Sequence, residues 1–471
     1  MKNRLIMLII ALFSVVNTEA SDRPNIIFIF ADDLGWGDLG CYGHNRLKTP
    51  SLDQMANEGM ILTNFYVANP VCSPSRTAVM TGQYPARHHI HQHLSHHKHN
   101  SSLDMPDFLN PGATLLTRLM QAGGYKTGHF GKWHLGHTEN SPSPSAYGID
   151  VHYTYNSSEV KITCPRHEST EKMVDEAIAF IERNKEENFY VNLWTLVPHA
   201  TLDPTNEQMA PYEKMAPKGV VKARGFSIPR QIYYGAVTDM DFHIGRLLDR
   251  LDELGLSKNT IVVFSSDNGP EDINIGNSSH SGVGSPGPLR GRKRSLYDGG
   301  VRVPFIVKWE GQTPAGIVDD MSIVGAVDLL PTFCNLAGVE LPEGYQSDGQ
   351  DMTPVFKGEK VERVQPLLWD WTGSQWGHTF NKSPGLALRS GKWKFLMNPD
   401  GSRVELYDFE ADPQFMELDN VAEQHPELIS KFSNILLDFK ASIPHGVSNE
   451  NSGSNNYPMP ASSVRPKNKT F

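Results

Sequence analysis

The chain has 471 residues, of which 39% are hydrophobic, and a formal net charge of −10. This composition is typical of a globular protein, and the length suits one large domain with a smaller one. The acidic balance argues against non-specific nucleic-acid binding, although a local basic pocket can still hold an anion. The four cysteines are too few and too scattered for a disulfide framework, so we expect at most one bridge among Cys41, Cys164 and Cys334.

Residues 1–20 predict a signal peptide for export. Two basic residues, Lys2 and Arg4, precede an apolar run, and a small residue, Ala20, stands where cleavage is expected. The apolar run is too short to cross a bilayer, and no later stretch is long enough. We therefore expect an exported protein that does not bind the membrane after cleavage. It would be periplasmic or secreted in a bacterium, and a eukaryotic secretory or lysosomal protein is the alternative.

Apolar strands alternate with amphipathic helices through the first half of the chain. Strands are predicted at 25–31, 125–132, 189–197 and 260–266, and helices at 114–122, 171–186 and 232–254. This order predicts an α/β fold with a mostly parallel sheet sandwiched by helices. Ligands bind such sheets beyond the carboxyl ends of the strands. The polar residues at those ends are therefore site candidates: Asp32, Asp33, Lys132, His134, His199, Asp267 and Asn268.

The side chains of Asp32, Asp33, Asp267 and Asn268 offer oxygen ligands and neither thiolate nor imidazole. Such a set suits Ca²⁺ or Mg²⁺ better than zinc. The alternative is that these dipeptides serve as helix caps or turns, which is their common use.

Three cations, Arg76, Lys132 and Lys293, lie in glycine-rich or serine-rich segments. Together with a metal ion they could hold a tetrahedral oxyanion such as sulfate or phosphate. Otherwise they belong to solvated basic loops. The two strand-end histidines, His134 and His199, could carry out acid–base catalysis or could simply be hydrogen-bonded structural residues.

After about residue 355 the pattern changes to short antiparallel strands, followed by a helix from about Pro426 to Ala441. We predict a catalytic domain at 21–355 and a smaller α+β domain with an antiparallel sheet at 356–445. The serine- and asparagine-rich stretch 446–471 predicts a poorly ordered tail.

Cys72 lies in P-V-C-S-P-S-R, a small polar turn beside Arg76 that gives the thiol no evident structural use. C-S-P-S-R resembles the C-x-P-x-R signature of the type I sulfatases, enzymes of the alkaline-phosphatase-like superfamily. Further blocks are similar to that family in the same order: P-N-I-I-F-I-F-A-D-D-L-G, G-K-W-H-L-G, S-D-N-G, Y-D-G-G-V-R-V-P and E-L-Y-D-F-E-A-D-P. The resemblance spans residues 24 to about 440.

The resemblance implies a sulfatase whose Cys72 is oxidised to Cα-formylglycine by a maturation enzyme. An aldehyde hydrate supplies one hydroxyl that attacks sulfur and a second whose deprotonation expels sulfate. One Ca²⁺ would be held by residue 72 with Asp32, Asp33, Asp267 and Asn268.

The resemblance also assigns roles to the cations and histidines. Arg76 would steady the hydrate, and Lys132 and Lys293 would hold sulfate oxygens. His134 would accept a proton, and His199 or Lys293 would protonate the leaving group. R-K-R around Lys293 departs from the family's usual G-K-G.

Two segments bear on the substrate. Residues 87–99 hold seven of the 19 histidines, and they could form a solvated loop, a substrate-contacting rim or a zinc site. Residues 369–378 hold three tryptophans, which could fill a core between domains or contact sugar rings. The candidate substrate contacts are His91, His93, Arg290, Trp371, Trp376 and His378.

These segments favour a sulfated carbohydrate over a small aryl sulfate. The chain also looks similar to bacterial polysaccharide sulfatases, including carrageenan sulfatases, and this resemblance implies a galactan-type substrate. Two other functions compete. One is a formylglycine-dependent phosphodiesterase or phosphonate hydrolase, and the other is a non-catalytic glycan-binding protein on the same fold.

Overall fold

The computed structural model describes residues 23–159, 161–215, 229–272, 280–371, 377–412 and 414–443. The predicted signal peptide, the tail at 446–471 and the candidate contact Trp376 lie outside these ranges. Within them, no helix is both long and apolar enough to span a membrane. All four cysteines are free thiols, so the disulfide allowed for above is not formed.

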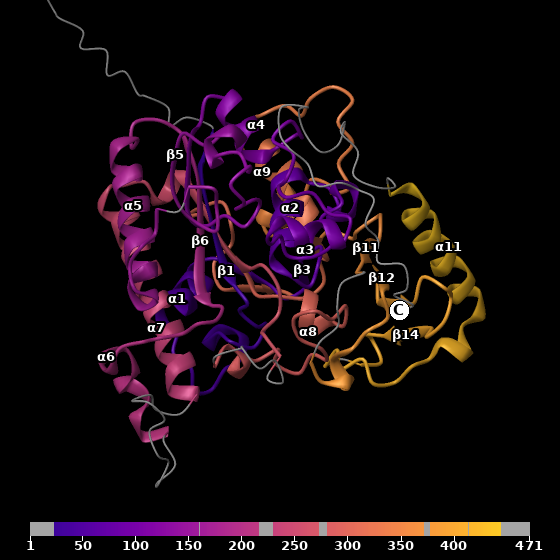
Figure 1. The fold of residues 1–471 in the computed structure, drawn as a ribbon. Coiled ribbons are helices and arrows are strands. Elements are labelled where there is room, and N and C mark those ends of the chain that lie inside the picture. Colours follow the sequence, from indigo (N-terminus) through magenta and orange to yellow (C-terminus); the bar gives the residue numbers. More distant parts are fainter. Residues whose placement is uncertain are drawn as a thin grey trace, which may run out of the picture.

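The centre of the molecule is an eight-stranded sheet with the order β5-β4-β6-β1-β7-β8-β2-β9 (Figure 1). The strands are β1 (Asn25–Asp32), β2 (Met60–Leu62), β4 (Lys126–Lys132), β5 (Val151–Tyr155), β6 (Phe189–Pro198), β7 (Thr260–Ser266), β8 (Phe305–Lys308) and β9 (Ile317–Asp319). The neighbours from β5 to β7 run parallel, whereas β8 is antiparallel to both β7 and β2. The predicted fold class, a mostly parallel sheet between helices, is confirmed.

Strand β1 shows why the sheet lies between two helical layers. Its eight residues are all buried, and successive side chains point to opposite faces. Ile26 and Phe28 belong to one hydrophobic core, and Ile27 and Ile29 belong to the other. A strand buried on both faces needs this continuous apolar run.

Helices cover both faces of the sheet. The core of Ile27 takes side chains from α1 (Pro50–Glu58), α5 (Ser169–Arg183) and α7 (Pro229–Glu253). The core of Ile26 takes them from α2 (Cys72–Thr81), α4 (Leu116–Ala122) and α9 (Leu329–Leu336). The helices expected at 114–122, 171–186 and 232–254 correspond to α4, α5 and α7, with ends displaced by two or three residues at most.

A second, four-stranded antiparallel sheet follows in the order β11-β12-β13-β14, with α11 (Pro426–Ser442) packed against it (Figure 1, yellow end of the colour bar). Its strands are β11 (Leu367–Asp370), β12 (Leu386–Ser390), β13 (Trp393–Met397) and β14 (Glu405–Asp408). Gly391 makes the tight turn between β12 and β13 with a φ of +50°, which glycine adopts easily. Phe395 and Leu406 of the sheet meet Phe432 and Leu436 of α11 in a separate small core.

Shorter elements complete the chain: β3 (Phe65–Tyr66) pairs with β10 (Val324–Gly325), and α3 (His97–Ser102), α6 (Asn206–Met209), α8 (Asp298–Val301) and α10 (Thr353–Phe356) lie in the connections.

The two sheets are joined through a buried ion pair. Lys394 on β13 places its Nζ 2.8 Å from Oδ1 of Asp298 on α8, and both side chains are fully buried. Burial would raise the pKa of Asp298, but Lys394 and Arg302 lower it below the ordinary value. The hydroxyl of Tyr66 also donates to this carboxylate, at 2.9 Å. The carboxylate therefore depends on partners from three separate segments.

We predict that Lys394→Met lowers the free energy of unfolding by about 3–5 kcal/mol, because it leaves Asp298 buried without its main counter-charge. Urea unfolding followed by fluorescence measures the change. Lys392→Met is the matched control, since Lys392 pairs with Asp408 and Glu410 at the surface and should barely move the transition. Equal shifts for both variants would contradict the prediction.

Candidate active site

The carboxyl ends of β1 and β7 bring four predicted residues together. Asp32 ends β1 and Asp33 follows it, while Asp267 and Asn268 follow β7, the parallel neighbour of β1. All four side chains are at most 1% exposed. The backbone N–H of Asp33, at a φ of 69°, donates to Oδ1 of Asp267 at 3.1 Å. Asn268 donates from Nδ2 to Oδ1 of Asp33 at 2.8 Å.

Each buried carboxylate has a cation from a distant part of the chain. Lys132, the last residue of β4, lies 2.8 Å from both oxygens of Asp32. Lys293 lies 2.6 and 2.7 Å from the oxygens of Asp33.

The third pair joins Arg76 to Asp267, with Nη2 2.6 Å from Oδ2. The side chain of Arg76 is fully buried, and its guanidinium lies 5.0 Å from the ring centroid of Trp194. Three carboxylates and three cations therefore balance one another at the edge of the sheet, as buried charges must.

The glycines of two predicted motif blocks allow this close packing. A Cβ on Gly269, in S-D-N-G, would lie 1.9 Å from the carbonyl oxygen of Gly299, in Y-D-G-G. The N–H of Gly269 donates to the carbonyl of Gly300 at 2.9 Å. Any larger residue at position 269 would separate the segment after β7 from α8.

Cys72 is the first residue of α2 and is 2% exposed. Its sulfur, one oxygen each of Asp32 and Asp33, and a ring nitrogen of His199 all lie within 4.8 Å of one another. Burial raises the pKa of the Cys72 thiol to about 11, even though Lys132 and Lys293 lower it. An unmodified Cys72 is therefore protonated at neutral pH and is a weak nucleophile.

His199 follows β6 and faces Asp33. Its Nδ1 lies 2.7 Å from the carbonyl oxygen of Ala200, which can only accept, so Nδ1 carries the proton. Its Nε2 lies 3.8 Å from Oδ2 of Asp33 and is the nitrogen directed at the site.

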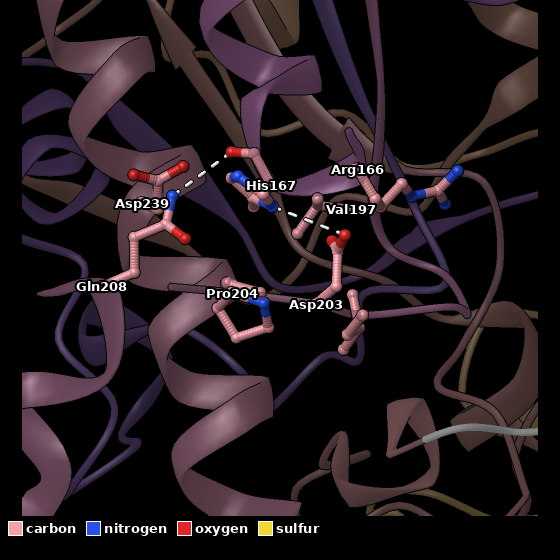
Figure 2. A pocket seen from close by; sticks show the side chains of 9 residues that line it. Arg166, His167, Val197, Asp203, Pro204, Gln208 and Asp239 are labelled. Carbon is pink, nitrogen blue, oxygen red and sulfur yellow. Dashed lines mark hydrogen bonds and ion pairs between the residues drawn. The ribbon is translucent and has the colours of Figure 1, made fainter. Parts of the chain in front are cut away.

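Arg166, which the sequence analysis missed, holds this loop. Its Nη2 donates to the carbonyl oxygens of Leu196 at 2.5 Å and of His199 at 3.0 Å. Figure 2 shows a small pocket that Arg166 helps to line. In this pocket His167 lies 3.4 Å from Asp203, and the guanidinium of Arg166 points away from both. Nothing in the local sequence around Arg166 signals this role, because its acceptors are backbone carbonyls about 30 residues away.

His134 and His93 approach the site from another side. Nε2 of His134 donates to the carbonyl of Leu94 at 3.0 Å, which leaves Nδ1 unprotonated in the neutral ring. Burial and Lys132 lower the pKa of His134 well below its ordinary value, so the ring is neutral. The His93 ring lies 6.5 Å from it, and burial, with His99 and Lys293, lowers the pKa of His93 to about 3.

The histidine run is not a solvated loop along its whole length. His88 and His89 are buried, the ring of His91 packs at a right angle to that of His89, and His96 and His97 are exposed. Among the described residues, the run contains no group of three ligands close enough to hold a metal ion.

Two predicted substrate contacts make structural contacts. Trp371 is 2% exposed and packs in the core that the two sheets share. Arg290 donates to the hydroxyl of Tyr407 at 3.2 Å and to the carbonyl of Glu417 at 2.8 Å, which commits its guanidinium to the junction of the sheets. His378 is exposed, and its Nδ1 accepts from the N–H of Phe380.

Glu271 and Arg294 also escaped the sequence analysis. The carboxylate of Glu271 lies 3.8 Å from Nζ of Lys293 and pairs with Arg294 through both guanidinium arms. Their positions in the sequence could have indicated that they belong to the site, because Glu271 follows S-D-N-G by two residues and Arg294 is next to Lys293.

The residues present fit a divalent cation. Asp32, Asp33 and Asp267 crowd three carboxylates together, and burial with the neighbouring Asp32 raises the pKa of Asp267 to about 6 despite Arg76. Oδ1 of Asn268 is buried and has no hydrogen-bond partner among the described residues. A hard cation would satisfy both the crowded charge and the unpaired oxygen.

The sequence profile of the sulfatase family matches residues 24–339, and the profile described as N-sulphoglucosamine sulphohydrolase, C-terminal, matches residues 291–442. The chain therefore belongs to the sulfatase family, and it is a sulfatase enzyme. This agrees with the resemblance drawn from C-S-P-S-R and the blocks around it.

Individual relatives agree with the family assignment. N-acetylgalactosamine-6-sulfatase of Mus musculus is 32% identical over 78% of this chain and 76% of its own. N-acetylgalactosamine-6-O-sulfatase of Bacteroides thetaiotaomicron is 27% identical over 90% and 94% of the two chains. The crystal structure of Ps i-CgsB has a TM-score of 0.76 at 27% identity, covering 90% of this chain and 94% of that one, and it has also been solved with k-i-k-neocarrahexaose.

The phosphonate monoester hydrolase of Agrobacterium radiobacter shares the fold, with a TM-score of 0.62 at 20% identity over 90% of this chain and 96% of that one.

Proposed function

We propose that the enzyme removes sulfate from a polysaccharide of galactose-type sugars, carrageenan-type galactans included. The observation that carries the proposal is the convergence of Arg76, Lys132 and Lys293 on the buried turn of Cys72. Three buried cations gathered at the carboxyl edge of the sheet suit a tetrahedral oxyanion. The names of the relatives, which refer to N-acetylgalactosamine, and the carrageenan oligosaccharide bound by Ps i-CgsB favour a galactose-type sugar.

In this proposal Cys72 is converted to formylglycine before the enzyme works. The hydrated aldehyde supplies a hydroxyl nucleophile and a second hydroxyl through which sulfate is released. The unmodified thiol, whose pKa is raised by burial, would itself be a weak nucleophile at neutral pH.

Asp32, Asp33, Asp267 and Asn268, with residue 72, would hold one Ca²⁺. The ion would supply positive charge next to the sulfate oxygens. Lys132 and Lys293 then donate to sulfate oxygens and no longer have to neutralise Asp32 and Asp33 alone.

The remaining residues handle protons. Nδ1 of His134 is an unprotonated acceptor and would take a proton from the spare hydroxyl. Nε2 of His199 faces the site and would protonate the leaving sugar oxygen. Nδ1 of His199 already carries a proton. His199 can therefore donate a proton from Nε2 only when both ring nitrogens are protonated.

We also propose that the enzyme is exported. A signal peptide at residues 1–20 would send the enzyme to the periplasm or the medium, where large sulfated polysaccharides are accessible. The enzyme would meet its maturation partner before it folds around Cys72, since the folded site buries that residue.

A comparison of substrates tests the reaction class. We expect hydrolysis of nitrophenyl sulfate to exceed that of a nitrophenyl phosphate diester by orders of magnitude, and defined sulfated galactan oligosaccharides to release sulfate. A preference for the phosphate diester would favour the phosphonate-hydrolase alternative. Failure to turn over any ester would favour the non-catalytic alternative.

Mass spectrometry tests the modification. In protein produced with the maturation enzyme, we expect the peptide that contains Cys72 to have lost its sulfur and to react with an aldehyde probe. Cys164, in the same digest, should remain a thiol. An active preparation with only unmodified Cys72 would refute the assignment.

Elemental analysis tests the metal. We expect about one calcium or magnesium per chain and no stoichiometric zinc, and added Ca²⁺ should raise the thermal midpoint of the metal-depleted protein because it binds the folded state. Asn268→Ala should remove most of that shift. Asn335→Ala, which changes an exposed amide, should keep it. Stoichiometric zinc would contradict the assignment.

Leaving-group dependence tests His199. We expect His199→Ala to slow hydrolysis of a sugar sulfate by about 10² to 10⁴, the usual contribution of a general acid, and to affect nitrophenyl sulfate much less. A nitrophenolate leaves without a proton, whereas a sugar alkoxide does not.

His167→Ala is the control, because His167 faces Asp203 in the adjoining pocket (Figure 2). Equal losses on both substrates in His199→Ala would indicate a positioning role, and Lys293 would then be the acid.

A further inference from the structure

A short turn at Thr379–Asn381 presents an aromatic side chain to solvent. Phe380 is 47% exposed, although large aromatic side chains are usually covered. It was not among the predicted substrate contacts. Of the two tryptophans expected to contact sugar in this region, Trp371 is buried and Trp376 lies outside the described residues.

The ring of Phe380 packs against the guanidinium of Arg290. The guanidinium of Arg290 lies 4.7 Å from its ring centroid and 3.7 Å from that of Tyr297, so the cation lies against both rings. Nε of Arg290 also donates to the carbonyl of Phe380 at 3.2 Å. Phe380 therefore has a contact with Arg290 and nearly half of its surface in solvent.

The turn is attached to the catalytic segment. Oδ2 of Asp272 accepts from Nδ2 of Asn381 at 2.7 Å and from the N–H of His378 at 3.1 Å. Asp272 follows Glu271, whose carboxylate lies 3.8 Å from Nζ of Lys293. Arg290 is itself three residues before Lys293. Asp272 and Arg290, which contact the turn, are therefore both close to the proposed sulfate-binding lysine: Asp272 through its neighbour Glu271, and Arg290 in the sequence.

We propose that Phe380, with the exposed His378, is a binding site for a sugar ring next to the one that carries the reacting sulfate. A rigid, flat apolar face suits the C–H face of a pyranose ring, and a neighbouring polar side chain can bind its hydroxyls. The inference rests on the proposed carbohydrate substrate. It assigns recognition of the neighbouring sugar to the second sheet, away from the residues that act on sulfate.

The test compares three substrates: a sulfated galactan hexasaccharide, the corresponding sulfated monosaccharide and nitrophenyl sulfate. We expect Phe380→Ala to raise KM for the hexasaccharide by about 3- to 10-fold with little change in kcat, because an aromatic contact of ordinary strength is lost. KM for the two smaller substrates should not change. Phe380→Trp should restore binding of the hexasaccharide.

Phe242→Ala is the matched control. Phe242 is 60% exposed on α7, and the ring nearest to it is that of its own neighbour, His243, so its loss should leave all three substrates unaffected. An unchanged KM for the hexasaccharide in Phe380→Ala would overturn the proposal, as would equal losses on all three substrates. If the wild-type enzyme hydrolyses nitrophenyl sulfate and neither carbohydrate, the proposed substrate class fails, which is a different result from failure of the Phe380 site alone.

Discussion

The burial of Asp32, Asp33 and Asp267 at one edge of the sheet constrains the rest of the molecule. An isolated carboxylate in such a place costs several kcal/mol of folding free energy, so each one needs a counter-charge within contact distance. Lys132, Lys293 and Arg76 supply these charges from β4, from the segment before α8 and from α2. The candidate site can therefore form only when the distant segments have packed around β1.

The same pairs bear on how the site could hold both a metal ion and an anion. Lys132 and Lys293 are each directed at a carboxylate. In the proposed function, Asp32, Asp33, Asp267 and Asn268 would hold a divalent cation, which would supply positive charge next to the sulfate. Lys132 and Lys293 would donate to sulfate oxygens.

The second sheet adds a surface to this chemistry. It is fixed to the large sheet by Lys394 and Asp298 and by the apolar core that contains Trp369 and Trp371. Arg290 contacts elements of both parts and supports the turn of Phe380. The residues proposed to act on sulfate gather at the carboxyl edge of the large sheet, whereas the proposed contact with a neighbouring sugar lies on a turn. The sequence of a loop can change without disturbing the core, so loops are suitable places for residues that determine substrate specificity.

The sequence alone predicted the fold class, since the apolar run at 25–31 and the helices at 171–186 and 232–254 carry their own periodicity. It also indicated most of the charged site, because residues that end parallel strands must meet at one edge of the sheet. These are local patterns combined with one topological rule. The family blocks, C-S-P-S-R above all, extended this to a reaction.

Only the tertiary structure decided which polar and aromatic residues are available. Trp371 and Phe380 lie nine residues apart with similar composition around them, yet one is 2% exposed and the other 47%. Arg166 and Glu271 acquire their roles from partners brought close by the fold. Arg290 was expected at the substrate, and its guanidinium donates to Tyr407 and to the carbonyl of Glu417. Exposure and pairing depend on contacts between separate segments of the chain, 30 residues apart for Arg166 and Leu196 and 127 apart for Arg290 and Glu417.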